Sequence, residues 1–151
     1  MTLPRGILKL PIHYYGGTVF LCKDRKCFVQ TYKHLHGDDY PENPEDAAGL
    51  TCEDAANKDG YAVFLVGVFD KNQSTILHEV VHLVLFIQKR ASINPLDDRG
   101  EATAHMIEHF YAEFTKKLNQ KPRKSKKESL TNPTNPRISS DNTTNSLTST
   151  H

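Results

Sequence analysis

The chain has 151 residues, of which 25% are charged and 37% hydrophobic, and its formal net charge is +1. A chain of this length has room for one modest domain. A net charge so close to zero argues against a protein that attracts nucleic acid or an acidic partner through its overall field. No apolar run approaches the roughly 18–20 residues that a membrane span requires, so we expect no membrane partner.

The cysteines predict a cytoplasmic protein. Cys22, Cys27 and Cys52 are odd in number, and the first 17 residues lack the long apolar stretch of a signal peptide. Reduced thiols are therefore expected. Because no second cysteine pair follows Cys22 and Cys27, these two are interpreted as small apolar packing residues and not as half of a zinc site.

The N-terminal part of the sequence predicts an irregular leader followed by a hairpin. Residues 1–16 contain two prolines and short apolar stretches, which argues against regular structure. Residues 18–22 and 27–32 are rich in apolar and β-branched residues and flank a polar turn. This pattern favours two antiparallel strands.

The middle of the chain contains the strongest predicted strand. A short helix is expected over residues 43–48 with Asn43 as its N-cap, and a turn over residues 51–56. Residues 61–69, YAVFLVGVF, are rich in β-branched and aromatic residues and end at a polar turn, which predicts a strand. Gly67 inside this strand indicates a bulge or the close approach of another backbone.

A helix is predicted over residues 75–90, capped by Ser74 or Thr75, and it contains the sequence HEVVH at positions 78–82. Apolar residues surround almost the whole helix, which predicts that it is buried in the middle of its domain.

The HEVVH sequence matches the HExxH pattern of zinc hydrolases. His78 and His82 are four residues apart and project from one face of a helix, so a single Zn²⁺ could bind both. Glu79 would lie beside the metal-bound water and act as its base. Such a site needs a third protein ligand from a neighbouring element.

A second helix, predicted over residues 101–118, offers that ligand. Its apolar residues form one stripe: Ala102, Met106, Phe110 and Phe114. On another face, Glu101 and His105 are one turn apart, and either could complete the metal site. The other residue of the two would then hydrogen-bond a ligand or stabilise the oxyanion of the tetrahedral intermediate.

Residues 119–151 differ from the rest of the chain. A Lys/Arg cluster at 121–127 is followed by a segment rich in Ser, Thr and Asn with few aliphatic residues. Such a segment cannot bury enough apolar surface to offset the entropy of ordering, so a disordered tail is predicted. The basic cluster is interpreted as solvated, and nucleic-acid contact through it is the less favoured alternative.

The order of these elements resembles the short zinc metallopeptidases of the ImmA/IrrE type, which occur in bacteria, mobile elements and phages. The resemblance covers residues 17–118. In that family the helix after HExxH opens with a Glu-Ala-Asn-like motif, which corresponds here to residues 101–103, with Thr103 in place of Asn. The small size of the chain suits a phage or prophage protein.

The resemblance implies a particular set of site residues. It makes His78, His82 and Glu101 the zinc ligands and Glu79 the catalytic base. SprT-like proteases use a histidine as the third ligand, and His105 is the residue that corresponds to it.

We therefore expect an α+β zincin-like domain over residues 17–118, with a short antiparallel sheet packed on the HExxH helix and a second C-terminal helix. Its expected function is zinc-dependent hydrolysis of a protein or peptide, with the substrate added to the edge of the strand at 61–69. The alternative is a catalytically silent binding or regulatory protein of the same fold, for example a phage anti-defence factor. Side chains of Glu101 and His105 that point away from the histidine pair would favour this alternative.

Overall fold

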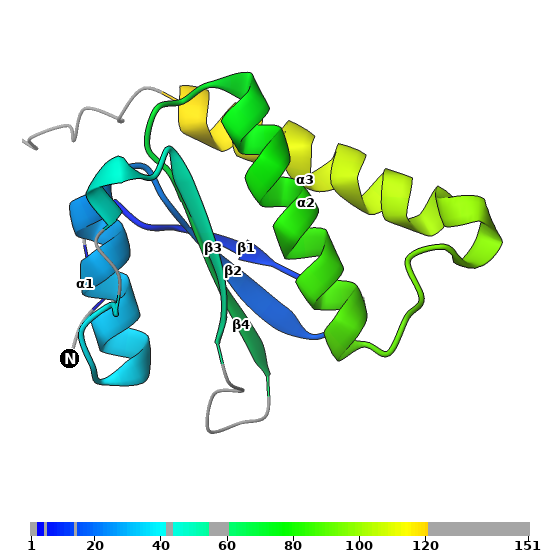
Figure 1. Cartoon of the computed structure of the whole chain (residues 1–151), viewed down its shortest axis with the longest axis horizontal. Coiled ribbons are helices and arrows are strands. Elements are labelled where there is room, and N and C mark those ends of the chain that lie inside the picture. Colours follow the sequence, from blue (N-terminus) through cyan, green and yellow to red (C-terminus); the bar gives the residue numbers. More distant parts are fainter. Residues whose placement is uncertain (1–2, 5, 14, 42–43, 55–60, 121–151) are drawn as a thin grey trace, which may run out of the picture. The chain divides into compact units, whose positions relative to one another are not determined.

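A computed structural model describes residues 3–4, 6–13, 15–41, 44–54 and 61–120, and its centre is a sheet with helices on both faces (Figure 1). The elements in chain order are β1 (Leu8–Pro11), β2 (Gly17–Cys22), α1 (Arg25–His36), the 3-10 helix η1 (Pro44–Asp46), β3 (Gly49–Asp54), β4 (Ala62–Val68), α2 (Gln73–Arg90), the 3-10 helix η2 (Asp97–Gly100) and α3 (Glu101–Asn119). The fold is therefore α+β, as expected. The predicted disordered tail lies outside the described residues.

The sheet is mixed, with the strand order β1-β2-β4-β3. β2 and β4 are parallel, with Gly17 opposite Ala62 and Cys22 opposite Gly67. The other two pairs are antiparallel. The prediction of an antiparallel sheet is therefore wrong for the central pair, β2 and β4. The reason is the long connection through α1 and β3, which allows β4 to run in the same direction as β2.

α1 occupies the place of the second strand of the expected hairpin, so that prediction is wrong. The Asp24 side chain caps the helix by accepting a hydrogen bond from the backbone N–H of Cys27 at 2.8 Å. Gly37, with φ of 85°, ends it in the left-handed conformation. The buried residues Cys27, Phe28 and Thr31 follow helical and not alternating spacing.

Both edge strands lie in segments for which no strand was predicted. Residues 1–16 were expected to be irregular, but β1 lies among them and pairs with β2. Pro11 ends this edge strand, where a missing N–H is tolerated. The expected turn at 51–56 is also wrong for residues 51–54, which belong to β3 and pair with β4, while residues 55–56 lie outside the described residues.

The strand prediction for 61–69 is confirmed by β4, in which all seven residues are buried. β4 is paired on both sides, so the expectation that a substrate adds to its edge is wrong. On that side of the sheet, β3 is the edge strand among the residues that the structure describes. A Cβ on Gly67 would lie 2.5 Å from the Phe69 ring and 2.9 Å from that of Phe28, so the glycine makes room for two aromatic side chains.

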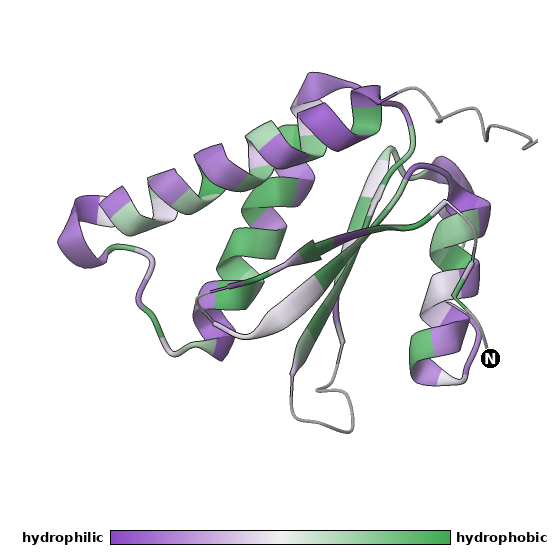
Figure 2. Cartoon of the chain, turned by 180° about the vertical axis from the view of Figure 1, so that it is seen from behind, coloured by the Kyte–Doolittle hydropathy of each residue, from purple (hydrophilic) through white to green (hydrophobic). Residues whose placement is uncertain are grey.

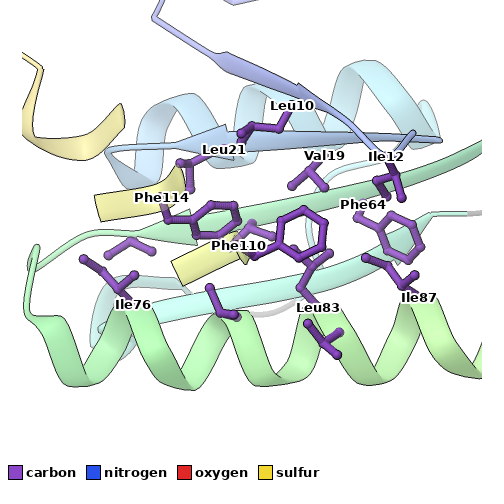
Figure 3. Close-up of a cluster of buried hydrophobic side chains, with 14 of the residues drawn as sticks. Leu10, Ile12, Val19, Leu21, Phe64, Ile76, Leu83, Ile87, Phe110 and Phe114 are labelled. Atoms are coloured by element: carbon purple, nitrogen blue, oxygen red, sulfur yellow. The ribbon is translucent and has the colours of Figure 1, made fainter. Parts of the chain in front are cut away.

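The two faces of the sheet carry separate hydrophobic cores. On one face, α2 and α3 pack against the strands through aliphatic and aromatic residues that include Ile76, Leu83, Ile87, Phe110 and Phe114 (Figure 3). On the other face, α1 covers a smaller core composed of Phe20, Cys22, Cys27, Phe28, Val63 and Leu65.

Arg25, the first residue of α1, holds the segment that leads into β3. Its guanidinium donates hydrogen bonds to the backbone oxygens of Pro44 at 2.9 Å and Ala47 at 2.7 Å. The same group lies over the Phe69 ring, 4.9 Å from its centroid. The expected helix at 43–48 is reduced to the single turn of η1, and its predicted cap, Asn43, lies outside the described residues.

α2 extends the predicted helix by two residues, because Asn72 and not Ser74 or Thr75 is its N-cap. The Asn72 side chain accepts a hydrogen bond from the backbone N–H of Ser74 at 3.1 Å. The composition of α2 predicted burial on all sides, and this prediction is wrong, because Leu77 and Leu85 are exposed. Figure 2 shows the many hydrophobic residues of this helix. The sheet and α3 cover only part of its circumference.

Candidate metal site

The HExxH residues of α2 lie in two different surroundings. His78 and His82 are exposed on the outer side of the helix, whereas Glu79 is buried, with only 4% of its surface accessible. This difference follows from the helical repeat, which rotates Glu79 away from the two histidines and toward β3.

The two histidines lie within hydrogen-bond distance of each other. Their Nε2 atoms lie 3.1 Å apart, and their rings are inclined at 77°. Two imidazole nitrogens on one tetrahedral Zn²⁺ would be separated by about 3.3 Å, given Zn–N distances of about 2.0–2.1 Å. His78 and His82 therefore fit a zinc ion as two of its ligands.

Glu79 is held by the free edge strand of the sheet. The Thr51 hydroxyl, on β3, lies 2.7 Å from Oε2 of Glu79 and 3.2 Å from its backbone oxygen. A hydroxyl has one hydrogen to donate, and the shorter contact is the one to the carboxylate. The bond fixes one carboxylate oxygen and leaves Oε1 as the oxygen that Thr51 does not contact.

Gly49 provides the space that Glu79 occupies. A Cβ at this position would lie 2.7 Å from both Cγ and Oε1 of Glu79. Such an approach is sterically forbidden without movement of the carboxylate, so the absence of a side chain at the start of β3 is what admits Glu79. The same strand residue belongs to a cavity of about 380 Å³ that His78, Glu79, Ser74, Thr75 and Ala48 also line.

Among the described residues, no third ligand lies with this pair. In the part of the chain that the structure describes, no three His, Cys, Asp or Glu side chains are grouped so that they could hold a metal ion. Glu101 is exposed at the first residue of α3. His105 lines a different cavity, beside His13 and Phe110, and its Nδ1 lies 3.7 Å from Glu108 Oε2. The identity of the third ligand stays a prediction.

The position of Glu101 follows from how α3 is attached to α2. Thr103 Oγ1 donates a hydrogen bond to the backbone oxygen of Pro95 at 2.6 Å and accepts one from Gln88 Nε2 at 2.8 Å. Gln88 is six residues beyond His82, so these bonds hold the start of α3 near the C-terminal end of α2 and not beside the histidines.

Sequence reasoning identified the three HExxH residues but missed Thr51 and Gly49. Both lie in β3, in or next to a segment that was expected to be a turn, and neither carries a motif. The sequence could have indicated them only through a short strand pattern at 49–54, and their role depends on the pairing of β3 with β4.

Comparison of the chain with protein-family models, with curated proteins and with solved structures finds no match. Among the described residues, none of the helices combines the length and the hydropathy needed to cross a membrane. The basic cluster at 121–127 lies outside the described residues.

Proposed function

We propose that this chain is a zinc-dependent peptidase. The observation that carries the proposal is the pair of facing nitrogens on His78 and His82, 3.1 Å apart, with Glu79 beside the same cavity as His78. Two imidazoles so disposed, with a buried carboxylate between them in sequence, are suited to a metal and to a base for an attacking water.

Each residue has a distinct role in the proposal. His78 and His82 would hold the zinc. The resemblance to ImmA/IrrE-type peptidases implies Glu101 as the third ligand, but the described residues do not place it beside the histidine pair. Bound zinc supplies Lewis acidity and makes water a stronger acid. Glu79 takes a proton from the attacking water through Oε1 and returns it to the leaving amine, while Thr51 keeps Oε2 in place.

The substrate is a peptide in an extended conformation. Among the strands that the structure describes, β3 pairs with β4 alone, and its first residue, Gly49, lines the cavity with His78 and Glu79. A peptide that pairs with β3 through main-chain hydrogen bonds would bring a carbonyl group near this cavity. The strand next to the helix thus replaces β4 as the proposed substrate strand.

Metal content and peptide cleavage, measured together on the full chain, test the proposal. We expect about one zinc per chain and cleavage of members of a peptide library. The Glu79→Gln variant should retain zinc and lose cleavage by a factor of at least about 10². His78→Ala and His82→Ala should lose the metal.

The variants Glu101→Gln and His105→Ala identify the third ligand, because only the true ligand lowers zinc affinity. Exposed His109, replaced by Ala, is the matched control on the same helix. Wild-type protein that binds no stoichiometric zinc at any pH would overturn the proposal.

A second candidate is a binding protein that uses this face without turnover. Two observations favour it. The described residues place no third metal ligand beside the histidines, and Leu85, one turn after His82, is 41% accessible. For this candidate, wild-type protein and Glu79→Gln should bind the same partner protein equally well, and the wild type should cleave no peptide.

A further inference from the structure

Two thiols outside the HExxH site lie in direct contact. The Sγ atoms of Cys22, the last residue of β2, and Cys27, in the first turn of α1, are 3.1 Å apart. Neither forms a disulfide in the structure, and both are buried, with 0% and 5% of their surfaces accessible. A disulfide has an S–S distance of about 2.04 Å, so the two sulfurs need to approach by only about 1 Å.

The surroundings make the two thiols unequal. In its ionised form Cys27 is stabilised by a hydrogen bond from Cys22, which lowers the pKa of the Cys27 thiol although burial acts against this effect. The same contact, together with burial, raises the pKa of the Cys22 thiol. Asp24, which accepts a hydrogen bond from the backbone N–H of Cys27, acts in the same direction as burial, because its charge disfavours the thiolate. Cys27 is also the more accessible of the two sulfur-bearing residues, so we assign it as the one that meets the oxidant and Cys22 as its resolving partner.

We propose that Cys22 and Cys27 form a reversible disulfide when the protein meets hydrogen peroxide. The Cys27 thiolate attacks one peroxide oxygen; an S–O bond forms, the O–O bond breaks, and the released oxygen leaves as water after taking up a proton. The product is a sulfenic acid at Cys27. The Cys22 sulfur then attacks the Cys27 sulfur; the S–S bond forms, the S–O bond breaks, and the Cys22 proton leaves with the hydroxyl group as water.

In the net reaction of these two steps, two thiols are oxidised to one disulfide and one hydrogen peroxide is reduced to two waters. A dithiol reductant reverses it by thiol–disulfide exchange. The proximity of Cys22 protects Cys27 from further oxidation, because the sulfenic acid is consumed before a second peroxide reaches it. The proposal is independent of the peptidase, since both cysteines lie in the core under α1, on the opposite face of the sheet from α2.

Tryptic mapping of the oxidised wild-type chain gives a direct readout. Trypsin cleaves after Lys23, Arg25 and Lys26, so peptides carrying Cys22 and Cys27 separate unless a disulfide joins them. After brief treatment with hydrogen peroxide and alkylation of remaining thiols, we expect the two peptides to be linked. Dithiothreitol should separate them and restore two alkylatable thiols.

Single variants of the full chain test the order of the steps. Cys22→Ser should accumulate a sulfenic acid at Cys27 that a dimedone-type probe captures, whereas Cys27→Ser should leave Cys22 unmodified at the same peroxide dose. Cys52→Ser is the matched control and should form the disulfide as the wild type does. Wild-type protein that keeps both thiols, links either of them to Cys52, or proceeds to sulfinic acid at Cys27 would overturn the proposal.

Discussion

The hydroxyl of Thr51 lies 2.7 Å from Oε2 of Glu79 and so joins the free edge strand of the sheet to the HExxH helix. Glu79 is therefore both the candidate base and a link between β3 and α2. These two roles respond differently to substitution. A variant that removes only the link changes stability, whereas one that removes only the carboxylate charge acts on the chemistry.

Replacing Thr51 by Val should destabilise the fold because it removes the donor to a buried carboxylate while keeping the side-chain volume. We expect the free energy of unfolding to fall by about 1–3 kcal/mol. Denaturant titration followed by circular dichroism measures this loss. Thr51→Ser keeps the hydroxyl and should recover most of it; equal losses in the Val and Ser variants would show that the hydrogen bond contributes nothing.

Replacing Gly49 by Ala should force Glu79 out of its position, because the new Cβ would lie 2.7 Å from Cγ and 2.9 Å from Cδ of that side chain. The expected cost is about 1–3 kcal/mol in the free energy of unfolding. A double-mutant cycle with Glu79→Ala provides the control. If the steric conflict is with Glu79, the cost of Gly49→Ala should largely disappear in the Glu79→Ala background.

Replacing Thr103 by Val should loosen the start of α3. The substitution leaves Nε2 of the fully buried Gln88 without its partner and frees the backbone oxygen of Pro95. We expect a loss of about 1–3 kcal/mol and faster amide hydrogen exchange in the first two turns of α3. Thr103→Ser retains both bonds and is the control. Unchanged exchange in the Val variant would contradict this account of how α3 is attached.

Replacing Asp70 by Asn should reduce the acid sensitivity of the fold. The backbone N–H of Asn72 and the hydroxyl of Thr75 donate to the Asp70 carboxylate and hold its pKa below the ordinary value of 3.8. Because the folded pKa is depressed, the stabilisation is present above pH 3.8 and is lost as the pH falls through the folded pKa.

Thermal unfolding of wild-type protein and Asp70→Asn at a series of acidic pH values measures this effect. The difference in Tm should be constant at neutral pH and shrink below pH 3.8. Thr75→Val, which retains the bond from Asn72, should give an intermediate result. A difference in Tm that does not change with pH would contradict the assignment.

The elements that the sequence predicts well are those with a long or unmistakable local pattern. α2, α3 and β4 were placed to within two residues at each end, because helical periodicity and a run of β-branched residues are local properties. α1 was missed because the apolar run at 27–32 suits a strand as well as a helix. The decisive signals, a capping Asp24 and a terminal Gly37, lie outside that run.

The candidate site divides in the same way. His78, Glu79 and His82 depend only on spacing within one helix, so the sequence is sufficient to find them. The contact of Thr51 with Glu79 depends on strand pairing, which no local pattern reveals. The direction of α3 depends on the connection at 91–100, where Ser92, Asp98 and Arg99 adopt left-handed conformations, which are uncommon for residues other than glycine.

The two hydrogen bonds from Arg25 to the backbone of Pro44 and Ala47 connect α1 to the segment that enters β3. The chain that they hold continues directly into Ala48 and Gly49, two residues that line the cavity beside the histidines. The position of these two cavity-lining residues therefore depends in part on the first turn of α1. A change in α1 that displaces Arg25 would reach Glu79 through three residues of backbone without any alteration of α2.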